Sequence, residues 1–97
     1  MKMEALQWLQ EWYKSQCDGD WEHSYGVHLE TLDNPGWLLK IDLEGTDLWE
    51  KDLDMVQMER SEHDWIFYKI KERKFEAAGG AMNLTEMIEI FKMIVEG

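Results

Sequence analysis

Two alternating runs around a short turn constrain the fold of this chain more than any other feature. Residues 24–32 alternate between apolar and polar positions, and residues 37–43 do the same. Between them stands Asp-Asn-Pro-Gly at 33–36, where proline precedes glycine as a type II turn prefers. A period of two is typical of half-buried strands, so the sequence predicts an antiparallel hairpin with one apolar face. That face carries Tyr25, Val27, Leu29, Thr31, Trp37, Leu39, Ile41 and Leu43.

Amphipathic helices are predicted at both ends of the chain. Residues 2–16 have a wide apolar arc with two tryptophans, which predicts deep packing against a sheet. Near the other end, Asn83 is predicted to cap a second helix, with Glu86 completing a capping box. The apolar stripe of this helix consists of Leu84, Met87, Ile88, Phe91, Ile94 and Val95.

The middle of the chain supplies the remaining strands. Residues 55–60, 65–71 and 74–77 are predicted as strands, and residues 45–54 as a loop or a short helical turn. Ala-Gly-Gly-Ala at 78–81 is expected to break the strand pattern. The order is α-β-β-β-β-β-α, which predicts an α+β fold with a mainly antiparallel sheet of about five strands and both terminal helices packed on it. A chain of 97 residues is too short for two cores, so residues 1–97 are expected to form a single domain.

Charge narrows the choice of partner. The formal net charge is −11, from 21 acidic and 10 basic residues. Most of the excess lies in residues 17–54, where acids far outnumber bases. A negative field repels phosphate backbones, which argues against direct nucleic-acid binding, and steers basic proteins toward the chain. Charge alone also fits an ordinary acidic soluble protein.

Membrane and cofactor roles are not indicated. The apolar runs are too short to span a membrane, and the N-terminus lacks a signal-peptide core. A single cysteine permits no internal disulfide, which fits a reducing compartment. The sequence therefore predicts a cytoplasmic protein without a cofactor.

The segment Cys-Asp-Gly-Asp-Trp-Glu-His at 17–23 concentrates reactive side chains. It fails as a calcium loop, because His23 stands where glycine is needed and Leu29 where a bidentate carboxylate is needed. Its spacing follows no zinc pattern. A small hydrolase built on Cys17, Asp20 and His23 remains an alternative, although acidic neighbours raise a thiol pKa. The structural alternative is a corner covered by Trp21, in which Glu22 or Asp20 accepts hydrogen bonds from loop amides.

Several segments together resemble one family. They are Trp-Leu-Gln-Glu-Trp-Tyr at 8–13, the segment at 17–23, Leu-Asp-Asn-Pro-Gly-Trp at 32–37, Glu-Arg-Ser-Glu-His-Asp-Trp at 59–65, and Gly79-Gly80 with Asn83-Leu84. Over nearly its whole length the chain resembles bacterial immunity protein family 53 of polymorphic toxin systems. The resemblance implies a small α+β protein, encoded beside a toxin, that protects its producer by binding that toxin. It implies no catalytic residues.

The resemblance and the charge together give a hypothesis for the binding site. The chain is expected to be a non-enzymatic inhibitor that occludes its cognate toxin stoichiometrically, with Trp49 as an apolar anchor among acids. Nuclease active sites are basic, so charge favours a nuclease as the toxin. A homo-oligomeric module joined by its Met- and Trp-rich surface is the other alternative. The predicted toxin-binding residues are Asp18, Asp20, Glu22, Asp42, Glu44, Asp47, Trp49, Glu50, Asp52 and Asp54.

The other tryptophans and the basic residues have plainer expected roles. The tryptophans at 8, 12, 37 and 65 sit at periodic positions, which favours the core over an interface. Lys69, Lys71, Arg73 and Lys74 form a small basic patch that is expected to be solvated.

Overall fold

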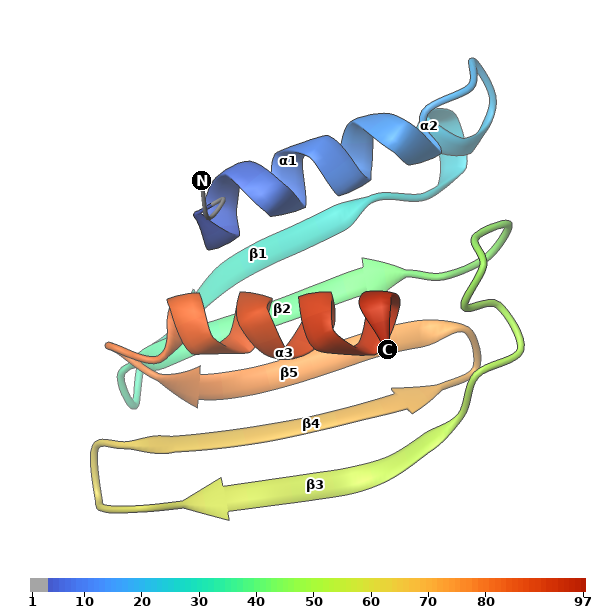
Figure 1. Ribbon diagram of the computed structural model, residues 1–97. Helices are drawn as coiled ribbons and strands as arrows, with labels where there is room; N and C mark the ends of the chain where they lie inside the picture. Colours follow the sequence, from blue (N-terminus) through green and yellow to red (C-terminus); the bar gives the residue numbers. More distant parts are fainter. Residues whose placement is uncertain (1–3) are drawn as a thin grey trace.

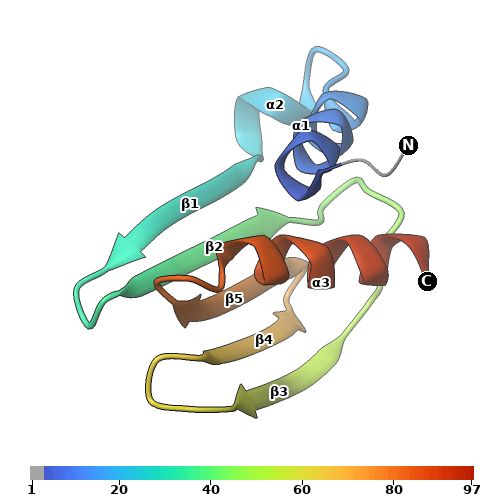
Figure 2. The same ribbon diagram turned by 60° about the vertical axis from the view of Figure 1, so that its left-hand side comes forward.

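A computed structural model describes residues 4–97 as one antiparallel sheet with two long helices on the same side (Figures 1 and 2). The helices are α1 (Ala5–Gln16), α2 (Trp21–Ser24) and α3 (Leu84–Glu96), and the strands are β1 (Val27–Leu32), β2 (Gly36–Asp42), β3 (Leu53–Glu59), β4 (Trp65–Lys71) and β5 (Lys74–Gly80). The predicted α+β class, with five strands between terminal helices, is confirmed. The short α2 was not expected, and positions 2 and 3 of the first predicted helix lie outside the described residues.

The sheet order is β1-β2-β5-β4-β3, and every neighbouring pair is antiparallel. The last strand in the chain therefore occupies the centre, between the β1–β2 hairpin and the β3–β4 hairpin. Leu39 of β2 pairs with Leu29 on one side and Ala77 on the other. The edges of the sheet are β1 and β3.

The core is centred on α3 and the middle strands. Phe91 of α3 and Phe75 of β5 are fully buried, with ring centroids 5.0 Å apart. Trp12 of α1 meets the same cluster, its ring centroid 4.9 Å from that of Phe91. The buried hydrophobic residues are Leu9, Trp12, Trp21, Leu39, Ile41, Leu43, Ile66, Ile70, Phe75, Ala77, Met87, Ile88, Ile90 and Phe91.

Helix α1 is less deeply packed than its sequence predicts. Of its apolar arc only Leu9 and Trp12 are buried, whereas Leu6 is 56% exposed and Tyr13 is 39% exposed. The reason is that α3 occupies the middle of the sheet, so α1 lies against α3 and meets the sheet only toward its β1 edge (Figure 2). Among the tryptophans expected in the core, only Trp12 is buried, and those at 8, 37 and 65 are half-buried.

The first hairpin also departs from its prediction. Residues 21–24 form α2, so β1 begins at Val27 rather than at residue 24. Because β1 is an edge strand that α1 covers incompletely, Leu29 and Thr31 are exposed instead of half-buried. The predicted type II turn is wrong, since Gly36 does not adopt a left-handed φ and is already the first residue of β2. The Asn34–Pro35 peptide bond is cis.

Two further predictions are wrong near the C-terminus. The strand β5 continues through Gly80, where residues 78–81 were expected to break it. Asn83 precedes α3, but its side chain makes no capping hydrogen bond. Instead, Asn83 Nδ2 donates to Asp64 Oδ1 at 2.9 Å, and Glu86 accepts from Arg60 Nη1 at 2.9 Å. A charged side chain from the β3–β4 turn therefore replaces the capping box.

The Arg60 cluster predicts a specific pH dependence. Hydrogen bonds from Arg60 lower the pKa values of Asp64 and Glu86 below their ordinary 3.8 and 4.5. The pKa values of both carboxyl groups are lower in the folded protein than in the unfolded chain. Their ion pairs therefore stabilise the fold fully when the pH is above the unfolded-state pKa values. This stabilisation is lost as the pH falls through the folded-state pKa values. In Arg60→Gln the free energy of unfolding should therefore fall less steeply as the pH is lowered. Urea unfolding at a series of acidic pH values would measure this.

Lys51→Gln provides the control for Arg60→Gln. It removes the same charge from an exposed residue that takes part in no ion pair among residues 4–97. Its free energy of unfolding should fall at low pH as steeply as that of the original protein. If Arg60→Gln also shows the original steepness, the Arg60 ion pairs contribute nothing to the pH dependence.

Candidate functional site

The corner between α1 and β1 is organised by two carboxylates. Asp18 Oδ1 accepts hydrogen bonds from the backbone N–H groups of Trp21 and Asp20, both at 2.9 Å. Glu22 accepts from the amides of Asp18 at 3.0 Å and Gly19 at 2.9 Å. The expected acceptor role is confirmed for Glu22, but Asp18 takes the place proposed for Asp20. Gly19 allows the bend because its φ of 96° is in the left-handed region.

The same hydrogen bonds shift the acidity of this corner. Amide donation, first from Trp21 and then from Asp20, lowers the pKa of Asp18. Amide donation also lowers the pKa of Glu22, chiefly by its own backbone N–H and then by those of Asp18 and Gly19. Both side chains therefore stay ionised to a lower pH than free carboxylates, and their hydrogen bonds to the loop amides hold them in a fixed negative loop.

Trp21 ties this corner to the loop between β2 and β3. Its side chain is only 7% exposed, and its indole Nε1 donates to the carbonyl of Glu44 at 2.7 Å. Its ring packs against those of Trp12 and Tyr13, with centroids 6.3 and 6.0 Å away. The prediction that Trp21 covers the corner is confirmed. The contact brings residues 17–23 beside residue 44, although they are far apart in the sequence.

The predicted binding residues lie at one end of the sheet, which we call the acidic end. In Figure 1 this is the right-hand end, where α2, the β2–β3 loop and the β4–β5 turn are found. Residues 44–50 form consecutive turns, and β3 begins at Leu53. For residues 45–52 a loop of turns is therefore the correct alternative, whereas residues 53 and 54, predicted as part of the loop, belong to β3, which spans 53–59 rather than the predicted 55–60. The acidic end comprises Asp18, Asp20, Glu22, Asp42, Glu44, Asp47, Trp49, Glu50, Asp52 and Asp54.

Three of these carboxylates already have partners on the β-strands or turns. Glu44 pairs with Arg73 at 2.9 Å, and Asp54 pairs with Lys71 at 2.9 Å. Asp42 accepts from the backbone N–H of Gly26 at 3.0 Å and lies 3.5 Å from His28 Nε2. The hydrogen bond that Lys71 donates to Asp54, and then the negative charge of Asp54, raises the pKa of Lys71.

Four carboxylates of the acidic end are not engaged in this way. Among residues 4–97, the side chains of Asp20, Asp47, Glu50 and Asp52 form no ion pair and no side-chain hydrogen bond. All four residues are exposed. They are therefore the negative charges of this end that remain available to a partner.

Trp49 is close in sequence to Asp47, Glu50 and Asp52, and its ring is held by Arg73, a residue predicted to belong to a basic patch. Its side chain is 45% exposed, and the guanidinium carbon of Arg73 lies 5.1 Å from its ring centroid. Arg73 thus bridges Trp49 and Glu44, and with Lys71 it belongs to the acidic end rather than to a separate basic patch. The sequence signal for Arg73 was its place in the basic patch, and in the structure it lies in the β4–β5 turn, where Glu72 and Arg73 both have positive φ.

The residues of the hydrolase alternative are not assembled by side-chain contacts. Cys17 is half-buried, and its thiol donates to the carbonyl of Tyr13 at 3.3 Å. Asp20 and His23 are joined through a backbone hydrogen bond of 3.1 Å, from the N–H of His23 to the carbonyl of Asp20. Within residues 4–97, no three His, Cys, Asp or Glu side chains are placed to hold a metal ion. None of the described helices is long and apolar enough to cross a membrane.

The structure is a small α+β domain with exposed carboxylates and a half-exposed tryptophan at one end of its sheet. The model of the family Immunity protein 53 matches residues 6–96, so the chain belongs to the Immunity protein 53 family. No match was found among curated proteins or among solved structures. Family membership gives the chain an immunity function directed against a toxin.

Proposed function

We propose that this protein neutralises its cognate toxin without catalysis, by forming a stoichiometric complex in which the acidic end covers a basic face of the toxin. Trp49 serves as the apolar anchor of that contact. The acids around it steer the encounter and pair with lysine and arginine side chains. The complex blocks the toxin for as long as it persists, so protection depends on the rates of association and dissociation.

The observation that carries this proposal is the set of unpaired carboxylates around Trp49. Asp47, Glu50 and Asp52 flank the ring in the sequence and take part in no ion pair among residues 4–97. Charges that are not satisfied within a chain are the ones that can gain a partner on binding without losing an existing one. Arg73, stacked on Trp49, limits the ring's freedom, so less side-chain entropy is lost when the partner binds.

Charge also favours a class of toxin. Enzymes that cleave nucleic acids present basic active sites, because their substrate is a polyanion. An acidic inhibitor placed over such a site resembles the substrate in charge. We therefore propose a nuclease as the target, and a cytoplasmic site of action where its substrate is found.

Neutralising the three acids beside Trp49 tests the proposal. The triple variant Asp47→Asn, Glu50→Gln, Asp52→Asn should associate with the toxin about tenfold more slowly at low salt, because electrostatic steering is lost. The original protein should associate more slowly as salt rises past about 0.15 M, and the variant should show a weaker salt dependence. Stopped-flow fluorescence would measure both rates.

A matched variant distinguishes the effect of the charges at the acidic end from the effect of the overall net charge on association. Glu62→Gln, Glu89→Gln, Glu96→Gln removes the same number of charges from exposed or partly exposed residues outside the acidic end. It should retain nearly the original association rate. Equal slowing of the two triple variants would contradict a defined binding face. Light scattering of the mixture should show one copy of each protein per complex, and a self-associated immunity protein would contradict that stoichiometry.

A further inference from the structure

The outer edge of β1 presents backbone groups that no other strand within residues 4–97 pairs with. The N–H of Asp42 donates to the carbonyl of Gly26, and that of Leu43 donates to the carbonyl of Arg73. Because hydrogen-bonded pairs alternate along antiparallel strands, β2 bonds to β1 through its even-numbered residues and to β5 through its odd-numbered ones. The N–H and C=O groups of the odd-numbered β1 residues therefore point away from the sheet. These residues are Val27, Leu29 and Thr31.

This edge lacks several of the features by which sheet edges avoid a further strand, and Glu30 is its one acidic side chain. Strand β1 contains neither lysine nor proline, and its pairing with β2 runs from Val27 to Leu32 without a shift in register. The other edge, β3, is irregular, with a register shift between Leu53 and Val56 and an acid, Asp54, tied to Lys71. Of the two edges, β1 is the one suited to receive a strand.

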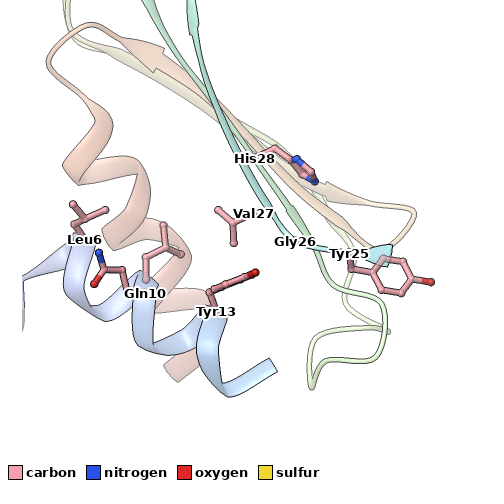
Figure 3. A pocket seen from close by; sticks show the side chains of 8 residues that line it. Leu6, Gln10, Tyr13, Tyr25, Gly26, Val27 and His28 are labelled. Carbon is pink, nitrogen blue, oxygen red and sulfur yellow. The ribbon is translucent and has the colours of Figure 1, made fainter. Parts of the chain in front are cut away.

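A groove lies beside the same edge, between β1 and α1. It has a volume of about 410 Å³, and its lining is mostly apolar. Figure 3 shows the side chains of Leu6, Tyr13 and Val27 bordering the groove. Val27 and Leu29 lie on the helix-covered face, since they pair with the buried Ile41 and Leu39. A strand added next to β1 would place alternate side chains in this groove.

We propose that β1 receives an extended segment of the toxin as a sixth strand, and this inference rests on the proposed function. The segment carries apolar residues on the face toward α1 and basic residues on the other face, where His28 and Glu30 of β1 lie. Charge complementarity selects this occupant: the chain carries −11, and β1 begins next to Asp42 of the acidic end. A second copy of the chain, with the same charge, would be repelled.

Amide hydrogen exchange gives the direct readout. In the free protein, the N–H groups of Val27, Leu29 and Thr31 should exchange rapidly, whereas those of His28 and Glu30 should already be protected. Binding of the inactivated toxin encoded beside this protein should protect the first three by at least about tenfold. Protection confined to residues 44–54, with the outward β1 amides still exchanging rapidly, would overturn the inference and leave the proposed function standing.

Proline substitution tests the same edge by removing one donor. Leu29→Pro deletes an outward N–H without deleting a bond to β2, and should weaken toxin binding by at least about tenfold. Leu29→Ala keeps the N–H, so its affinity for the toxin should stay within about threefold of that of the original protein. This loss is smaller than the one expected for Leu29→Pro. Thermal unfolding verifies that each variant is folded, and Thr31→Pro replaces Leu29→Pro if the latter is not. Equal binding of folded proline and alanine variants would contradict the inference.

The opposite edge supplies a matched control. The N–H of Arg60 donates to the carbonyl of Asp64, so the alternation along β3 directs the N–H of Gln57 outward as well. Gln57→Pro is therefore the same change on the other edge, and it should leave toxin binding unaltered. If both proline variants weaken binding equally, β1 has no special role. If the original protein binds no toxin at all, the proposed function itself fails.

Discussion

Replacing Phe91 by alanine should lower the free energy of unfolding by about 3–5 kcal/mol. The side chain is fully buried, and its ring meets those of Trp12 at 4.9 Å, Phe75 at 5.0 Å and Trp8 at 5.9 Å. It therefore joins α1 to the sheet through α3. Its removal leaves a cavity that the surrounding rings cannot fill without moving. Urea unfolding followed by tryptophan fluorescence would measure the loss.

Met93→Ala is the control for this prediction. It lies on the same helix but is 67% exposed, so its truncation should change stability by no more than about 0.5 kcal/mol. A domain of this size is stabilised by only about 5–15 kcal/mol, so Phe91→Ala removes a large share of the total. A loss of less than about 1 kcal/mol would show that the aromatic cluster repacks.

The elements of this fold could be predicted because each one repeats its apolar residues at its own period. The stripe through Met87 and Phe91 defined α3, and the alternation through Leu39 and Ile41 defined β2. Periodicity states which face of an element is apolar, but it does not state which neighbour covers that face. For this reason the wide apolar arc of α1 was assigned to a deep position that α3 in fact occupies.

The sequence predicted which acidic residues could form the candidate site, but not which of them have partners within the chain. The acids of residues 17–54 can be counted from the sequence, whereas their partners come from distant elements. Trp21 reaches Glu44 across 23 residues, and Arg73 reaches the same residue across 29. Such contacts depend on sheet order, and no local pattern of residues encodes the placement of β5 beside β2. Which acids are free to bind a partner could therefore be read only from the structure.

Gly80→Ala should destabilise the protein by about 1–3 kcal/mol, the usual range for overpacking. A Cβ at this position would lie 2.5 Å from the carbonyl oxygen of His63 and 2.8 Å from Asn83 Oδ1. The first of these atoms is backbone, so the β3–β4 turn itself would have to move. Asn83 Oδ1 is buried without a hydrogen-bond partner among the described residues, and a methyl group against it supplies none.

Gly26→Ala isolates the contact from the general effect of replacing glycine. Apart from its two chain neighbours, no described residue lies within 4 Å of a Cβ at Gly26, and its φ is outside the left-handed region. Losing glycine restricts the unfolded chain in both variants, which stabilises each by about 0.4–1 kcal/mol where the folded backbone tolerates alanine. The difference between their unfolding free energies, measured in urea, therefore reports the steric contact at Gly80. Equal stabilities would show that β5 has room for a side chain at position 80, and that glycine is not needed there for the close approach of Asn83 and the β3–β4 turn.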